Sequence, residues 1–199
     1  MPNLQSKIRF IHGIPTAPAV DVYLDGEVSF KNLKFSDITC YENISPGKYK
    51  IKIYAAGTYD NPLISKDIDI LPTKTLSISI VALTDSVDIF VLNDSNVKKE
   101  TTSSALRFIH LSPNTPLISL LLPNDMVLFS NVEYLESTGY YTLSPAIYDF
   151  KVSFSGASGL YKYINNKTMN AGKAYTIYII GLLNKTPTLG YLLVEDEGN

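Results

Sequence analysis

The stretch Lys48-Tyr49-Lys50-Ile51-Lys52-Ile53 alternates charged and apolar residues without a break. Successive side chains of a β-strand point to opposite faces, so this stretch predicts a strand with one face in a core and its lysines in water. Residues 148–154, which read YDFKVSF, repeat the alternation. We therefore expect a core that contains Tyr49, Ile51, Ile53, Tyr148, Phe150 and Val152, and solvated side chains at Lys48, Lys50 and Lys52.

The two halves of the chain repeat each other. Its only two histidines end the same tetrapeptide, at Arg9-Phe10-Ile11-His12 and again at Arg107-Phe108-Ile109-His110, an offset of 107 − 9 = 98 residues. Residues 45–49 (SPGKY) match residues 144–148 (SPAIY) at an offset of 144 − 45 = 99. Collinear matches over half the length of 199 residues indicate an internal duplication.

Short alternating segments, separated by turn residues, predict about seven strands in each copy. In the first copy we expect them near residues 7–12, 19–24, 27–34, 38–42, 48–55, 64–70 and 75–92, the last span being two strands. No segment has a helical period with caps at both ends. The sequence therefore predicts an all-β protein of two tandem, similar antiparallel β-sandwiches of the immunoglobulin or transthyretin kind. The expected boundaries are 1–95 for the first domain, 96–103 for a linker and 104–199 for the second domain.

The composition is that of an ordinary globular protein. The chain is 45% hydrophobic and 18% charged, with a net charge of −2. This balance gives no basic patch for nucleic acid, and no apolar run is long enough for a membrane span. We expect neither partner, and the oligomeric state is left open. Glu195-Asp196-Glu197 is interpreted as a solvated tail.

Residues 8–26, which read IRFIHGIPTAPAVDVYLDG, resemble the bacterial domain-of-unknown-function family 4397, and so do Pro46-Gly47-Lys48-Tyr49 and residues 54–57. The resemblance covers the whole chain in two tandem copies, the first being the stronger. It implies a surface or secreted β-sandwich module with no known activity. Where the family has an acidic residue between two prolines, this chain has Thr16 and Asn114, and Ser119 stands in place of the first copy's Asp21.

No catalytic or metal-binding pattern is present in the sequence. Cys40 is the only cysteine, so an intrachain disulfide is impossible, and we interpret it as a small, partly buried side chain in a strand. Two histidines without clustered Cys, Asp or Glu do not make a metal site. No phosphate-binding loop or nucleophile elbow occurs. We expect no enzymatic activity, no metal and no cofactor.

The repeated tetrapeptide is nevertheless the best candidate for a special site. The candidate binding residues are Arg9, His12, Asp21, Arg107 and His110. On a strand, Phe10 and His12 share one face and Arg9 lies on the other. We expect His12 to fix the following proline-rich loop through backbone hydrogen bonds. We expect Arg9 to pair with Asp21 or with loop carbonyls, while Arg107 needs another acceptor.

Two functions are consistent with these observations. The first is a non-catalytic structural or adhesive module of a bacterial surface or spore layer. The alternative is a module that binds a glycan or other polymer through exposed tyrosines, of which there are 14, and the proline-rich loops. The expected partner is a protein or a polysaccharide at a surface. The location is the cell surface, the medium or the spore if an export signal has been removed, and the cytoplasm otherwise.

Overall fold

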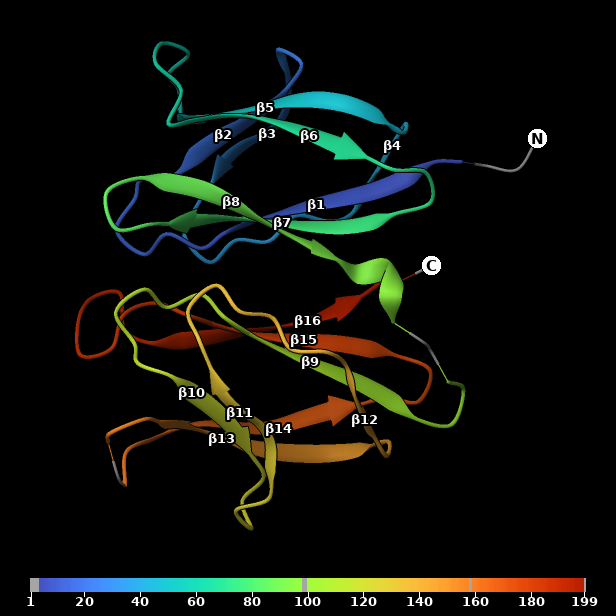
Figure 1. Cartoon of the computed structure of the whole chain (residues 1–199), viewed down its shortest axis with the longest axis vertical. Helices are drawn as coiled ribbons and strands as arrows, with labels where there is room; N and C mark the ends of the chain where they lie inside the picture. The colour runs from blue at the N-terminus through green and yellow to red at the C-terminus, as the bar shows by residue number, and fades with distance from the viewer. Residues whose placement is uncertain (1–3, 98–99, 158, 199) are drawn as a thin grey trace. The chain divides into compact units, whose positions relative to one another are not determined.

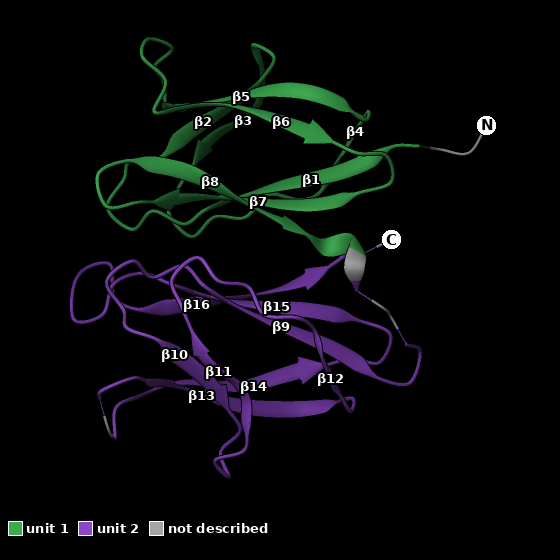
Figure 2. Cartoon of the chain, viewed as in Figure 1, with its two compact units in different colours: residues 1–95, 199 green, residues 96–198 purple. Residues whose placement is uncertain are grey.

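The computed structural model describes residues 4–97, 100–157 and 159–198. Its chain forms two compact units, unit 1 of residues 1–95 and unit 2 of residues 96–198 (Figures 1 and 2). Strands make up almost all of the regular structure, and the described residues contain one short 3-10 helix, η1 (Asp94–Asn96). No helix in the described part of the chain has the length and apolarity needed to cross a membrane.

Unit 1 is a sandwich of two four-stranded sheets. One sheet has the order β4-β1-β7-β8 and the other has the order β3-β2-β5-β6. The strands are β1 (Ser6–His12), β2 (Val20–Leu24), β3 (Glu27–Leu33), β4 (Glu42–Ile44), β5 (Gly47–Ala55), β6 (Ile64–Ile70), β7 (Thr75–Ala82) and β8 (Val87–Asn93).

Unit 2 repeats this architecture strand for strand. Its sheets have the orders β12-β9-β15-β16 and β11-β10-β13-β14, which are those of unit 1 with eight added to each label. The all-β prediction with two similar sandwich domains is therefore confirmed. The strands are β9 (Ser104–His110), β10 (Ile118–Leu121), β11 (Val127–Val132), β12 (Tyr141–Leu143), β13 (Ala146–Phe154), β14 (Tyr161–Met169), β15 (Ala174–Ile180) and β16 (Gly190–Asp196).

The antiparallel pairing that the sequence predicts has one exception in each unit. β1 runs parallel to β7, with His12 opposite Ile80, and β9 runs parallel to β15. A parallel pair needs a long crossover connection, and here strands β2 to β6 supply it: β2, β3, β5 and β6 form the opposite sheet, and β4 returns to pair with β1. The first strand is thereby inserted between β4 and β7, at the centre of its sheet.

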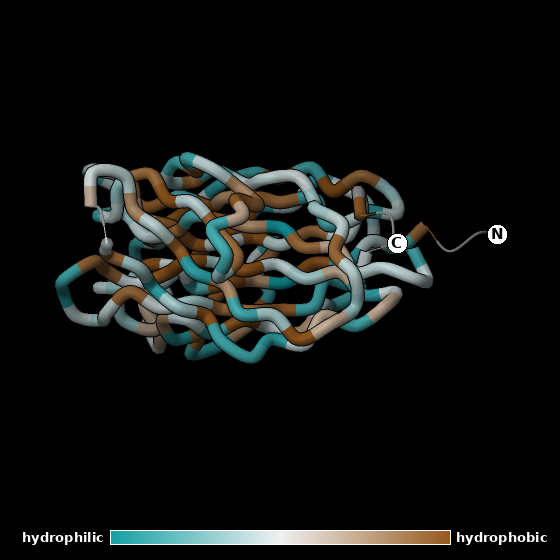
Figure 3. The backbone as a smooth tube through the Cα atoms, turned by 90° about the horizontal axis from the view of Figure 1, so that it is seen from below, coloured by the Kyte–Doolittle hydropathy of each residue, from teal (hydrophilic) through white to brown (hydrophobic). Residues whose placement is uncertain are grey.

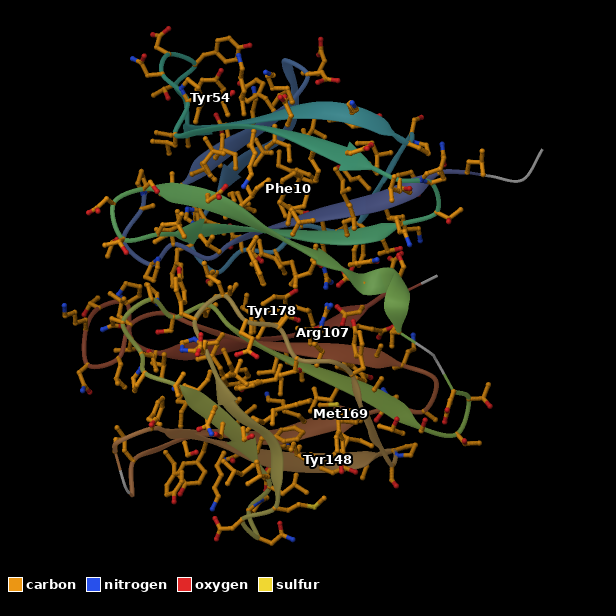
Figure 4. The ribbon with its side chains drawn as sticks, viewed as in Figure 1. Phe10, Tyr54, Arg107, Tyr148, Met169 and Tyr178 are labelled. Carbon is orange, nitrogen blue, oxygen red and sulfur yellow. The ribbon has the colours of Figure 1, made fainter. Side chains whose placement is uncertain are left out.

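The core of each unit lies between its two sheets, and Figure 4 shows Phe10 in that position in unit 1. Ile51, Ile53, Phe150 and Val152 are fully buried, as the alternation predicts. Along the chain, brown apolar stretches alternate with pale and teal ones in Figure 3, as expected for strands that bury one face. The two predicted core tyrosines are only half-buried, because each donates its hydroxyl to a backbone carbonyl at the rim: Tyr49 to Ser45 and Tyr148 to Ser144.

The segment predicted as a strand at 38–42 is mostly not a strand. Only a single bridge joins Ile38 to Ile11, and β4 begins at Glu42. Between them the Thr39 N–H donates to the Phe10 carbonyl at 3.0 Å, while the Phe10 N–H donates to the Thr39 side-chain hydroxyl at 3.0 Å. A side chain thus replaces one backbone partner and interrupts the ladder. Cys40, which we expected in a strand and partly buried, is exposed and outside any strand.

The segment predicted as a linker, 96–103, belongs to unit 2. Val97 is buried and packs with Ala105 and Ala174. Residues 98 and 99 of this segment lie outside the described residues. At the other end of unit 2, β16 continues to Asp196, which is fully buried. The prediction that Glu195-Asp196-Glu197 forms a solvated tail is therefore wrong for Asp196.

Candidate functional site

All five candidate residues are buried, and each is held by partners in its own unit. The alternation of side chains along a strand explains where the two arginines lie. Because Phe10 and Phe108 face the cores, Arg9 and Arg107 lie on the other face of β1 and β9. Figure 4 shows Arg107 on the side of its sheet away from the core residue Met169. The buried candidates are Arg9, His12, Asp21, Arg107 and His110.

Arg9 lies in a buried polar network. Its Nε donates to the Ser77 hydroxyl at 2.7 Å, and its terminal nitrogen lies 4.0 Å from an Asp94 carboxylate oxygen. The same oxygen accepts hydrogen bonds from Ser77 and from the Tyr41 hydroxyl, the latter at 2.8 Å. The Tyr41 ring covers the guanidinium, whose carbon is 4.3 Å from the ring centroid. The charge of Arg9 is therefore balanced, hydrogen-bonded and covered inside unit 1.

Unit 2 contains the same network with one conservative change. Arg107 donates from Nε to the Thr176 hydroxyl at 3.0 Å and lies 3.6 Å from Asp196. Asp196 also accepts from Thr176 and, at 2.8 Å, from the Tyr140 hydroxyl, while the Tyr140 ring lies 4.8 Å from the guanidinium carbon. The repeated arginine is thus the centre of a repeated structural network. Sequence reasoning missed both aspartates of these networks.

The predicted pair of Arg9 and Asp21 does not form. Val20 and Val22 face the core, so Asp21 lies on the outer face of the sheet that contains β2, whereas Arg9 lies on the outer face of the opposite sheet. Asp21 instead accepts two backbone N–H groups, from Asn32 at 2.7 Å and from Gly57 at 2.9 Å. Its role is to fix the β2–β3 bulge and the turn after β5.

The prediction that His12 fixes the proline-rich loop is confirmed. Its Nδ1 accepts the Ile14 N–H at 3.3 Å, and its Nε2 lies 2.9 Å from the Pro18 carbonyl oxygen. Because Nδ1 accepts a hydrogen bond and Nε2 faces a carbonyl oxygen, the imidazole is the neutral tautomer with its proton on Nε2. His110 repeats the arrangement, with the Ser112 N–H at 3.2 Å from Nδ1 and the Pro116 carbonyl at 3.2 Å from Nε2.

Burial lowers the pKa of both His12 and His110, and their backbone carbonyl partners only partly offset it. The unfolded chain, with histidine near pKa 6.5, binds these protons more readily. The stability supplied by the neutral imidazoles is therefore complete above about pH 6.5 and is lost as pH falls below it, with a slope of at most about 1.4 kcal/mol per pH unit for each histidine.

Urea unfolding at pH 7.5, 6.5 and 5.5 should show this loss before most carboxylates titrate. His110→Asn, whose side-chain oxygen can accept the Ser112 N–H, should remove the slope contributed by unit 2 and leave that of unit 1. Equal stability of the unaltered protein at pH 7.5 and 5.5 would contradict the prediction.

A group of three tyrosines lies outside the predicted site residues. Tyr23 of β2 and Tyr54 of β5 lie on the outer face of their sheet, and Tyr59 comes from the following loop. All three ring pairs are in contact, at centroid distances of 5.3 Å for Tyr23–Tyr54, 5.1 Å for Tyr23–Tyr59 and 4.9 Å for Tyr54–Tyr59. Figure 4 shows Tyr54 at the outer side of unit 1. The number of tyrosines was evident in the sequence, but their convergence on one face was not.

The fold and the buried networks define a protein of two similar β-sandwich domains. A family model described as a domain of unknown function (DUF4397) matches residues 6–121, and the chain belongs to this family. The match runs from the first residue of β1 to the last residue of β10. No curated protein matches the chain at a significant level. Among the described residues no group of three or more His, Cys, Asp or Glu side chains is placed to hold a metal ion.

Proposed function

We propose that the chain is a non-catalytic structural or adhesive module of a bacterial surface or spore layer, built from two tandem copies of the family domain. The observation that carries this proposal is the use of the repeated polar residues. Arg9 and Arg107 centre buried networks, and His12 and His110 hold loops, in the same way in both units. These residues stabilise a rigid scaffold, so we infer that the surface of the protein carries its function.

The surface itself is consistent with a structural role. Opposite charges are paired along exposed strands, as in Lys50 with Asp67 at 3.3 Å and Lys66 with Asp88 at 2.7 Å. Such pairs contribute little stability but keep strand edges polar and limit edge-to-edge aggregation. Sandwiches of this architecture recur among cell-surface proteins, and that analogy of fold adds support.

The location of the protein tests this proposal directly. Antibodies against the full chain should label intact cells or spores of the organism that encodes it, and the protein should fractionate with the envelope or spore layer. A strain without the protein should show altered surface cohesion or attachment. Detection only after lysis, in the soluble fraction, would contradict the proposal.

The second candidate function, glycan or polymer binding, is favoured by one observation. The tyrosine trio places an exposed ring, that of Tyr59, on top of a buried one, that of Tyr54. The proline-rich loops give less support, since His12 and His110 hold their backbone carbonyls.

A further inference from the structure

Tyr59 is an exposed aromatic ring with a buried aromatic support. The residue is 56% exposed, whereas Tyr54 beneath it is 2% exposed. The two rings are stacked with an interplanar angle of 22°, and Tyr23 meets both rings nearly edge-on. Stacking on Tyr54 covers one face of the Tyr59 ring, and the exposure of the residue leaves the other face open to solvent.

The loop that carries Tyr59 is anchored from below by a buried carboxylate. Asp21 accepts the Gly57 N–H at 2.9 Å, and Gly57 has a φ of +77°, a conformation that other residues adopt at a cost. The Thr58 hydroxyl and N–H both donate to the Ala55 carbonyl, at 2.8 and 3.0 Å. A ring held in this way loses little conformational freedom when a ligand stacks on it.

We propose that the open face of Tyr59 is a stacking subsite for a pyranose ring of a neutral polysaccharide. The apolar C–H face of a pyranose fits a flat aromatic ring, and its hydroxyl groups need polar partners at the rim. Asp60 and Asn61, both exposed, follow Tyr59 directly in the loop and supply a carboxylate and an amide. The negative charge of Asp60 disfavours anionic polymers. The proposal gives a ligand class to the adhesive role proposed above and rests on that role.

The described residues of unit 2 do not form this subsite, and unit 2 therefore provides an internal control. Its sheet carries other residues at the positions of Asp21, Tyr23 and Tyr54, namely Ser119, Leu121 and Ser153. Tyr163 is as exposed as Tyr59, at 59%, but the Tyr161 ring beside it is tilted by 51° at a centroid distance of 6.2 Å and offers no parallel support. Comparing variants at Tyr163 and Tyr59 therefore distinguishes the effect of an exposed tyrosine alone from that of an exposed tyrosine stacked on a buried ring.

The experiment is affinity electrophoresis of the full chain through gels that contain a β-glucan, a mannan, a xylan or an α-glucan, with alginate as the anionic comparison. Because the chain has no tryptophan, tyrosine fluorescence gives an independent binding curve. We expect retardation by at least one neutral polymer and none by alginate. Tyr59→Ala should weaken that binding by about tenfold or more, while Tyr59→Phe and Tyr163→Ala should stay within about twofold of the unaltered protein.

A further variant separates stacking from loss of fold. Tyr59→Leu still covers Tyr54 with an apolar side chain but has no flat face, so it should keep the melting temperature and lose the binding. The proposal is overturned if no neutral polymer retards the protein, if alginate binds equally well, if Tyr163→Ala has the same effect as Tyr59→Ala, or if Tyr59→Leu binds normally. Surface labelling of intact cells or spores would still support the structural role in each of these cases, so the two failures are distinguishable.

Discussion

Asp196→Asn is expected to destabilise unit 2 by about 3–5 kcal/mol, the usual cost of removing one partner from a buried ion pair. Asp196 is fully buried and accepts hydrogen bonds from Tyr140 and Thr176 beside Arg107. Asparagine keeps the shape of the side chain but removes the carboxylate charge that lies 3.6 Å from the Arg107 guanidinium, and the Arg107 side chain is only 4% exposed. Urea unfolding followed by circular dichroism and tyrosine fluorescence measures the change.

The neighbouring Glu195 provides the matched control. It pairs with Lys173 at 2.6 Å, but both side chains are more than 40% exposed. Exposed pairs contribute up to about 1 kcal/mol, so Glu195→Gln should have a small effect. Asp94→Asn, the corresponding change in unit 1, should resemble Asp196→Asn. Equal effects of the changes at 195 and 196 would show that the network does not stabilise unit 2.

The aspartates of the two networks escaped sequence analysis for identifiable reasons. Tyr41 and Tyr140 are 140 − 41 = 99 residues apart, as are Ser77 and Thr176, whereas Asp94 and Asp196 are 196 − 94 = 102 apart. The connection from β15 to β16 is longer than that from β7 to β8, which breaks the constant offset. Asp196 also lies between two glutamates, and an acidic run resembles a solvated end. Allowing the offset to change between the last two strands would have revealed the pair.

The sequence predicts features that depend on a single strand more accurately than features that depend on how strands pair. Alternation places Ile51 and Ile53 in the core because the period of a strand is local. Whether Arg9 reaches Asp21 depends instead on which sheet each strand joins. β1 pairs with β7 across 68 residues of sequence, as in the Arg9–Ser77 hydrogen bond, and no local pattern records that choice. The strand that the sequence predicts around Cys40 is likewise interrupted by a side chain, that of Thr39, which replaces a backbone partner.

Alternation along a strand is also insufficient to predict burial on the outer faces of the sheets. The alternation of residues 148–154 puts Lys151 on the outer face with Asp149 and Ser153, yet it is 8% exposed. It pairs with Asp125, and its ammonium group lies 4.8 Å from the Tyr161 ring centroid. The tyrosines of β14 and of the loop after β5 thus form small clusters on faces that a simple inside–outside pattern assigns to solvent.

Ile51→Ala is expected to destabilise unit 1 by about 2–5 kcal/mol, because a fully buried side chain is removed and the surrounding core closes only partly around the space. Lys50→Ala, one residue earlier on the same strand, should change stability by about 0.5 kcal/mol or less, since its side chain is 52% exposed and its partner Asp67 is more exposed still. The two variants share the strand, the β-propensity context and the hairpin, and differ only in the face that they alter. A slip of β5 by one residue would exchange the two faces and reverse the order of the two effects. Unfolding curves in urea for the two variants therefore test the register of β5, and with it the placement of Tyr54 beneath Tyr59.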